Sequence, residues 1–223
     1  MKILALGAHP DDVEIYCFGT LLAFKAQGHE IAWAVATDGS PKGAGPEMAT
    51  TRKAEATAGA ALAGIKPIFL GFQDGALGQD PALVPTLEAL YAAEKPDLII
   101  THPPEDYHPD HRALSVAALD AGRFRVPVLY ADTLNGTGFT PQYWVDISAH
   151  MATKQAAIRC HVSQRPERFV ESATTLNRLR SLQCNAGTEG AYAECFRFDP
   201  RAPFADVRGM LPPAPEVKPL VRW

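Results

Sequence analysis

The stretch KILALGAHPDD, residues 2–12, joins a short apolar segment to a turn with three ionisable side chains. Residues 3–8 form a continuous apolar run, which predicts a buried strand, and His9-Pro10-Asp11-Asp12 follows it directly. From Val13 to Gln27 apolar residues recur at helical spacing, and Gly28 is typical of a helix C-terminus. The stretch therefore predicts a strand, a polar turn and a helix, which is the repeating unit of an α/β protein.

The same alternation continues along the chain. Further strands are expected at residues 31–37, 66–70, 98–101, 127–130 and 143–147, and helices at 48–62, 81–94, 111–121, 149–160 and 167–183. This pattern predicts an α/β fold, a Rossmann-like three-layer sandwich whose mostly parallel sheet is covered on both faces. We expect a single domain over residues 1–198 and a tail over 199–223, which contains six prolines and packs on the domain.

The composition excludes several classes of function. The 223 residues carry a formal charge of −4, and no run of five or six Lys or Arg occurs, so a nucleic-acid or anionic-membrane surface is not expected. No segment approaches the roughly 20 apolar residues of a membrane-spanning helix. The four cysteines lack C-x-x-C spacing, which predicts reduced thiols in a cytoplasmic protein.

A second polar turn, His108-Pro109-Asp110-His111, comes after the fourth expected strand and a short loop. In the common strand order 3-2-1-4-5, strands 1 and 4 are neighbours, and ligands bind outside their carboxyl ends. The two polar turns are therefore expected to face each other across one crevice.

Histidines and carboxylates that converge on one point are typical of a catalytic zinc site, which takes three protein ligands and leaves a fourth position for water. Imidazole nitrogens favour zinc over magnesium or calcium, and the remaining aspartate and histidine would supply acid–base chemistry. Either turn alone could be a helix cap, but capping explains the carboxylates and not three histidines. A nucleotide site is not expected, because the first turn has a lone glycine and two acids where a pyrophosphate needs amide donors.

With these two turns the sequence resembles the LmbE-like or PIG-L family of zinc-dependent N-deacetylases. The resemblance covers about residues 1–198. Further agreement lies at Gly19-Thr20-Leu21, Thr37-Asp38-Gly39, Arg52, Glu55, Leu70-Gly71, Asp74-Gly75, Asp106-Tyr107, residues 161–164 and residues 192–196. The resemblance implies a hydrolase that removes acetate from an N-acetylglucosamine-type sugar or sugar conjugate, and it implies a homo-oligomer, a trimer or hexamer.

Carried over position by position, the resemblance implies a zinc ion held by His9, Asp12 and His111. It implies Asp11 as the general base that acts on water. Because Asp11 and Asp12 are adjacent and point different ways, one can ligate while the other faces the water.

For the remaining positions, the resemblance implies His108 as a charged acid or oxyanion stabiliser, held by Asp110. Arg52 and Asp74 match positions that contact substrate hydroxyls or orient the metal turn. The chain departs from the family at Tyr16 and Phe18, where small residues are frequent, and this could reshape one wall of the pocket.

Three alternative functions stay open at this point. Within the family they are an amidase of thiol-sugar conjugates and a natural-product tailoring deacetylase; from another class, the chain could be a non-catalytic metal-binding protein. Asp11 discriminates against the last, because a binding protein has no use for a carboxylate that is not a ligand beside an open metal position. His102, which ends the fourth strand, is a further candidate to line the pocket, whereas residues 192–196 are expected to be core.

Overall fold

One seven-stranded sheet forms the centre of the computed structural model, which describes residues 1–184 and 190–217. The strand order is β3-β2-β1-β4-β5-β7-β6. The strands are β1 (Lys2–Gly7), β2 (Glu30–Thr37), β3 (Ile68–Phe72), β4 (Leu98–Thr101), β5 (Val128–Ala131), β6 (Tyr143–Asp146) and β7 (Ala193–Phe198). Neighbours from β3 to β5 are parallel, and β7 runs antiparallel to both β5 and β6. The predicted order 3-2-1-4-5 is therefore confirmed.

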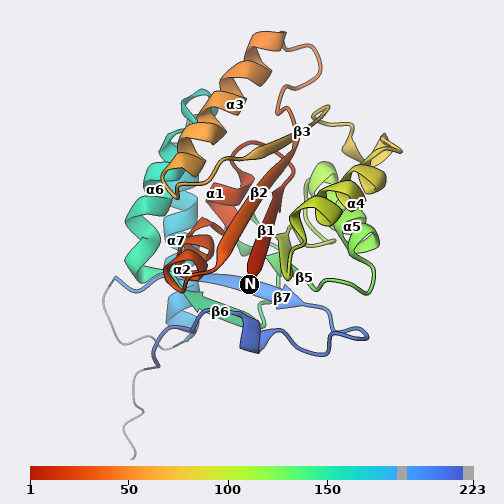
Figure 1. Cartoon of the computed structure of the whole chain (residues 1–223). Coiled ribbons are helices and arrows are strands. Elements are labelled where there is room, and N and C mark those ends of the chain that lie inside the picture. The colour runs from red at the N-terminus through yellow and green to blue at the C-terminus, as the bar shows by residue number, and fades with distance from the viewer. Residues whose placement is uncertain (185–189, 218–223) are drawn as a thin grey trace, which may run out of the picture.

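Helices cover both faces of this sheet (Figure 1). One face carries α1 (Asp12–Tyr16), α2 (Phe18–Ala26), α3 (Pro46–Ala61), α6 (Met151–Arg159) and α7 (Glu167–Gln183), and the other carries α4 (Leu83–Glu94) and α5 (Pro109–Gly122). Along β1, Ile3 and Ala5 belong to the core under the first group, and Leu4 and Leu6 belong to the core under the second. A strand buried on both faces has no polar positions, which explains the continuous apolar run and confirms the three-layer sandwich.

The helix expected from Val13 to Gln27 is two helices. Cys17, with φ −144°, leaves the helical conformation between α1 and α2. The carboxylate of Glu194 accepts hydrogen bonds from the backbone N–H groups of Gly19 (3.0 Å) and Thr20 (2.7 Å) in the first turn of α2. Lys154 on α6 donates to Glu194 at 2.6 Å, so a fully buried ion pair caps α2. The apolar periodicity runs through the break, and it therefore predicted one helix.

The strand β7 was not expected. Residues 192–196 were predicted to be core, and Cys195 and Phe196 are indeed buried, but the segment is also a strand between β5 and β6. The possible sixth strand at residues 143–147 is confirmed as β6.

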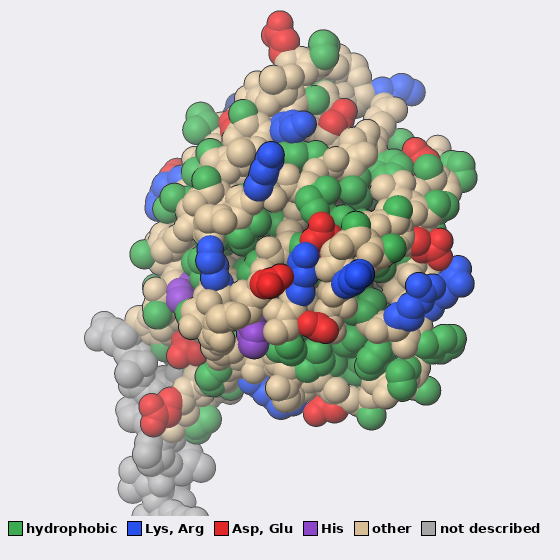
Figure 2. All heavy atoms as spheres, viewed as in Figure 1, with side chains coloured by type: hydrophobic (Ala, Val, Ile, Leu, Met, Phe, Trp, Pro, Cys, Tyr) green, Lys and Arg blue, Asp and Glu red, His purple; other side chains and the backbone are tan. Residues whose placement is uncertain are grey.

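Residues 199–217 run along the edge of the sheet formed by β6. Val207 and Leu211 are buried in the first core, and the backbone N–H of Asp146 donates to the carbonyl of Pro213 at 2.9 Å. The division into a domain and a tail stays a prediction, and residues 218–223 of that tail lie outside the described residues. On the face seen in Figure 2, Lys and Arg side chains are interspersed with Asp and Glu.

Candidate metal centre

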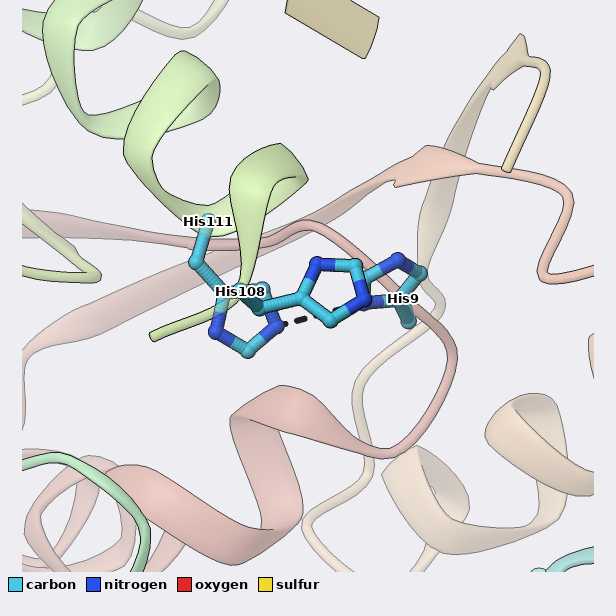
Figure 3. Close-up of side chains that lie close together, drawn as sticks. All are labelled: His9, His108 and His111. Atoms are coloured by element: carbon cyan, nitrogen blue, oxygen red, sulfur yellow. Dashed lines mark hydrogen bonds between the residues drawn. The ribbon is translucent and has the colours of Figure 1, made fainter. Parts of the chain in front are cut away.

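The turns after β1 and β4 meet at the carboxyl edge of the sheet because these two strands are hydrogen-bonded neighbours. His9 comes from the first turn, and His108 and His111 come from the start of α5 (Figure 3). The three rings lie against one another, and His9 Nδ1 is 3.2 Å from His111 Nε2. Strand order thus brings together two turns that are far apart in the sequence.

The side chains of His9, Asp12 and His111 form a triangle in which Asp12 turns a different oxygen to each histidine. Asp12 Oδ2 lies 3.4 Å from His9 Nδ1, and Asp12 Oδ1 lies 3.4 Å from His111 Nε2. A tetrahedral zinc ion with bonds of about 2.0–2.1 Å separates its ligand atoms by roughly 3.3 Å. Each pair of the three expected ligands therefore has the spacing of zinc ligands, and a bound ion would take one of the two Asp12 oxygens or both.

The other ring nitrogens of both histidines lie against carboxylates. His9 Nε2 is 3.2 Å from Asp74 Oδ1 and 3.4 Å from Asp110 Oδ2. His111 Nδ1 is 3.1 Å from Asp106 Oδ1, although this N–H is not aligned for a hydrogen bond. Such carboxylates fix the tautomer that leaves His9 Nδ1 and His111 Nε2 free to bind a metal.

The charges of the cluster also suit a cation. Burial by itself lowers the pKa of His9, but hydrogen bonds to Asp110, Asp12 and Asp74 raise it to about 12. At His111, Asp12 and Asp106 likewise overcome burial and raise the pKa to about 9. Although burial opposes it, His111 and His102 hold the pKa of Asp12 well below its usual range. Protons on His9 and His111 balance the negative charges of the carboxylates, and a bound metal ion would displace these protons.

Other combinations of donor atoms in this cluster also come close together. Within the described residues, groups of donors within 4.8 Å are His9 with His108 and His111, Asp12 with His102 and His111, and His9 with Asp74 and Asp110. His102 Nε2 is already engaged, because it lies 3.1 Å from both the backbone N–H of Ala8 and Asp12 Oδ2. His102 thus lies beneath the pocket as a support for Asp12, and burial, with the charge on His111, lowers its pKa to about 4.

Asp11 lies beside the triangle without joining it. Its backbone has φ +126°, an uncommon value for a residue other than glycine, which turns its side chain away from that of Asp12. Asp11 Oδ2 contacts Arg52 Nη2 at 3.1 Å. Burial raises the pKa of Asp11 to about 7, although Arg52 opposes the shift. This value suits a general base near neutral pH.

Arg52 was expected to bind substrate or to orient the metal turn. It is buried, and it donates to the carbonyls of Gly39 (2.9 Å) and Pro10 (2.6 Å) as well as to Asp11. These contacts hold the first polar turn in place. Asp74 is more exposed, and it lies at the opening of the crevice beside His9. Substrate binding by either residue stays a prediction.

His108 was expected to be held by Asp110, and the two residues are in contact through the Asp110 backbone. The backbone N–H of Asp110 donates to His108 Nδ1 at 3.2 Å, so His108 caps α5. The Asp110 carboxylate instead accepts from the backbone N–H groups of Gly75 (2.7 Å) and Leu77 (3.2 Å) and contacts His9. Burial and the charges on His9 and His111 lower the pKa of His108. Since Nδ1 is an acceptor, the neutral ring carries its proton on Nε2.

Asp106 and His161 lie in segments that match the family, but their contacts at the site, and the part played by Glu14, were not predicted from the sequence. Asp106 Oδ1 accepts from the backbone N–H of His108 at 2.8 Å and faces His111, and its position two residues before His108 is typical of such a turn. Glu14 on α1 and His161 form a fully buried pair, with Oε1 and Nε2 2.7 Å apart. No local pattern indicates that residues so far apart in the sequence are partners.

The fold and this cluster together define a class: α/β proteins with a histidine–carboxylate metal site at the carboxyl edge of a parallel sheet. Residues 4–122 match the family described as GlcNAc-PI de-N-acetylase, or PIG-L, and the chain belongs to this family. The resemblance seen in the two polar turns is confirmed, and with it the expected enzyme class, an N-deacetylase.

The chain is also similar to individual proteins. It is 29% identical over 234 residues to diacetylchitobiose deacetylase of Thermococcus kodakarensis, with 92% of this chain and 88% of the relative covered. It is 25% identical over 231 residues to 1D-myo-inositol 2-acetamido-2-deoxy-alpha-D-glucopyranoside deacetylase of Mycolicibacterium vanbaalenii, with 73% and 80% covered. The solved structure of N,N'-diacetylchitobiose deacetylase from Pyrococcus horikoshii aligns with a TM-score of 0.77 at 26% identity, covering 89% of this chain and 83% of that one.

Among residues 1–184 and 190–217, no helix has both the length and the apolar character needed to cross a bilayer.

Proposed function

We propose that the chain is a zinc-dependent hydrolase that removes the acetyl group from an N-acetylglucosamine-type sugar or sugar conjugate. His9, Asp12 and His111 hold the zinc ion, Asp11 is the general base, and His108 stabilises the developing oxyanion.

The position of Asp11 carries this proposal. A protein that only stores or senses a metal needs ligands, and the triangle of His9, Asp12 and His111 would be enough. Asp11 lies next to this triangle in a strained backbone conformation, held by Arg52. Strain of this kind persists where the surrounding structure enforces it, often for function, and here it holds a second carboxylate next to the proposed ligand Asp12.

When bound, zinc polarises the amide carbonyl and lowers the pKa of water in its shell. Asp11 Oδ atoms take the proton of the attacking water, while Arg52 fixes the orientation of the carboxylate. The Asp11 carboxyl group then holds a proton that the departing amine needs. Arg52 is therefore a positioning residue, which acts by orienting the Asp11 carboxylate.

His108 acts on the other side of the scissile bond. Its Nδ1 is engaged by the Asp110 backbone, so Nε2–H is the free donor of the half-buried ring. A donor fixed where negative charge develops stabilises the transition state more than the ground state. This role does not require His108 to be charged, since the neutral tautomer also donates from Nε2.

The sugar is supported by the relatives and by the rim of the crevice. The relatives from Thermococcus and Mycolicibacterium are named for substrates that share an N-acetylated glucosamine unit. Around the opening of this chain, Asp74, Tyr107 and His108 are partly or fully exposed. Sugar hydroxyls need such polar partners, and the rim offers little apolar surface for a long chain.

The test is acetate release by the purified full chain from N-acetylglucosamine, diacetylchitobiose, and the inositol and malate conjugates of N-acetylglucosamine. We expect release from at least one of them, loss of release after chelation, and recovery on addition of zinc. Absence of release from the whole panel, or release by chelated protein shown to be metal-free, would contradict the proposal. A thiol-sugar conjugate in the same panel tests the amidase alternative.

We also propose a homo-oligomer, a trimer or hexamer, and a cytoplasmic location. The family resemblance supports the oligomer, and four free cysteines support a reducing compartment. Light scattering on the purified chain measures the first.

A further inference from the structure

Tyr16 lies directly behind the metal-site histidines. Its ring makes edge-on contacts with His102 and His111, with centroids 5.4 and 6.0 Å apart. The residue is 8% exposed, and its hydroxyl group interacts with Tyr107 at the rim. The Tyr16 side chain therefore extends from the buried histidines His102 and His111 toward the exposed Tyr107 and forms one wall of the site.

Two small cavities lie on either side of Tyr16. The first adjoins the metal site and is lined mostly by apolar side chains together with Asp12 and His102; it includes Leu6, Val13, Ile100 and Ala131. The second extends between α1, the segment after β5 and α7; its walls are mixed, with Ile15, Leu134 and Leu176 beside the polar residues Asp132, Thr133, Asn135, Ser172 and Asn177. Neither has room for an acyl chain as it stands. Of the described residues that line these two cavities, Tyr16 alone lines both.

The direction of the acyl group follows from the polarity of the walls. The sugar is bulky and must stay at the open side, where Tyr107 is exposed and His108 half-buried. Two other sides present charged groups, Asp11 with Arg52 and Asp110 with Asp74, against which a methyl group gains nothing. The wall formed by the Tyr16 ring is apolar and adjoins the first, mostly apolar cavity, so we infer that the acetyl methyl group points there.

We propose that Tyr16 is the specificity-determining residue that limits the acyl group to acetyl, by filling the space between the two cavities. The inference rests on the proposed deacetylase function and adds a substrate limit to it. Without the ring, the two cavities would join into one channel from Asp12 to α7, mostly apolar next to the metal site and mixed beyond it, with room for a short acyl chain.

The experiment compares N-acetyl-, N-butanoyl- and N-hexanoylglucosamine, or the same acyl series on whichever sugar the wild type accepts. The enzymes are the wild type, Tyr16→Phe, Tyr16→Leu and Tyr16→Ala. The wild type should prefer acetyl over butanoyl by at least about tenfold in kcat/KM, since one or two methylenes count this much in a closed pocket. Tyr16→Phe keeps the ring, so it should keep this preference. Tyr16→Ala should shift the ratio toward the longer chains by about tenfold or more.

A binding measurement makes the test independent of turnover. Titration of the zinc-loaded protein with acetate and with hexanoate should show hexanoate gaining affinity in Tyr16→Ala and not in Tyr16→Phe. Tyr16→Leu, which removes less volume, carries the comparison if Tyr16→Ala does not fold, with zinc content and thermal unfolding as checks.

The proposal is overturned if folded, zinc-loaded Tyr16→Ala, or Tyr16→Leu in its place, keeps the wild-type acyl ratio and gains no hexanoate binding. It is also overturned if the wild type cleaves hexanoyl and acetyl substrates equally well. Failure of the wild type on every N-acyl sugar would instead contradict the proposed function, while the hexanoate titration would still test the wall at Tyr16.

Discussion

The neighbouring residues Asp11 and Asp12 have different backbone conformations, and we propose different roles for them. Asp12 begins α1, and its carboxylate accepts from the backbone N–H of His9 at 2.7 Å and faces His102 and His111. Asp11 has a positive φ and turns to Arg52. In the proposed mechanism, Asp12 is the third ligand and Asp11 is the base that takes up the proton.

Replacement of each aspartate by asparagine should separate these roles. Asp12→Asn removes an anionic ligand, so it should weaken zinc binding and lose activity mainly through metal loss, partly recoverable with excess zinc. Asp11→Asn leaves the three ligands in place, so zinc content should stay near wild type while turnover falls by about 10² to 10⁴-fold. Metal analysis and steady-state kinetics on both variants measure this.

Substrate affinity should change much less than turnover in Asp11→Asn, because a base acts mostly in the transition state. Near wild-type turnover in Asp11→Asn, or loss of its zinc to the extent seen in Asp12→Asn, would require the two roles to be exchanged or abandoned.

The buried pair of His161 and Glu14 makes a prediction about stability and pH. Burial alone lowers the pKa of His161, but the Glu14 carboxylate raises it above the ordinary 6.5. A raised histidine pKa means that the folded state binds the proton more tightly than the unfolded state. The stabilisation is therefore fully present below about pH 6.5 and is lost as the pH rises through the folded pKa.

Urea unfolding of the wild type and of His161→Gln between about pH 5.5 and 9 should show this dependence. The difference in unfolding free energy should be largest at the acid end and should shrink as the pH rises. His150→Gln is a control outside the pair. If the difference in unfolding free energy between the wild type and His161→Gln stays constant over the whole pH range, the proposed linkage is ruled out.

At the scale of elements, the break between α1 and α2 depends on a buried ion pair. The break frees N–H groups at Gly19 and Thr20, and Glu194 from β7 accepts both while Lys154 from α6 balances its charge. Removal of one member of such a pair leaves an uncompensated buried charge, which destabilises by about 3–5 kcal/mol.

Lys154→Met should therefore lower the unfolding free energy by about 3–5 kcal/mol, and addition of Glu194→Gln should recover part of the loss. The exposed pair Arg123–Glu88, at 2.8 Å, provides the matched control. Arg123→Met should lower the unfolding free energy by no more than about 1 kcal/mol. Equal losses from Lys154→Met and Arg123→Met in urea unfolding would contradict the importance given to the buried cap.

The elements that could be predicted from the sequence are those with a local signal. Along the chain, continuous apolar runs typical of buried parallel strands alternate with apolar residues at helical spacing, and turn residues mark the ends of both. β7 carries no such signal, because it pairs with β5 and β6 through contacts distant in sequence, and its Glu194 is buried where a strand pattern predicts an apolar residue. The break at Cys17 depends on the same residue, Glu194. The unpredicted strand β7 and the unpredicted break between α1 and α2 are therefore connected through Glu194.

For the whole molecule, sheet topology explains why the site could be located from sequence. Parallel strands in the order 3-2-1-4-5 bring the turns after β1 and β4 together, whatever the residues between them. The supports of the site could not be predicted in this way. Arg197, on β7, forms an ion pair with Glu105 and so ties the last strand to the loop before His108. This contact depends on the antiparallel addition of β7, which only the tertiary structure reveals.

The central claim is that His9, Asp12 and His111 hold one zinc ion in each chain. The most direct measurement is elemental analysis of the purified wild type and His111→Ala after reconstitution with zinc and removal of excess metal. We expect about one zinc per wild-type chain and loss of stoichiometric zinc in folded His111→Ala. Full retention of zinc by folded His111→Ala would contradict the assignment on which the proposed mechanism depends.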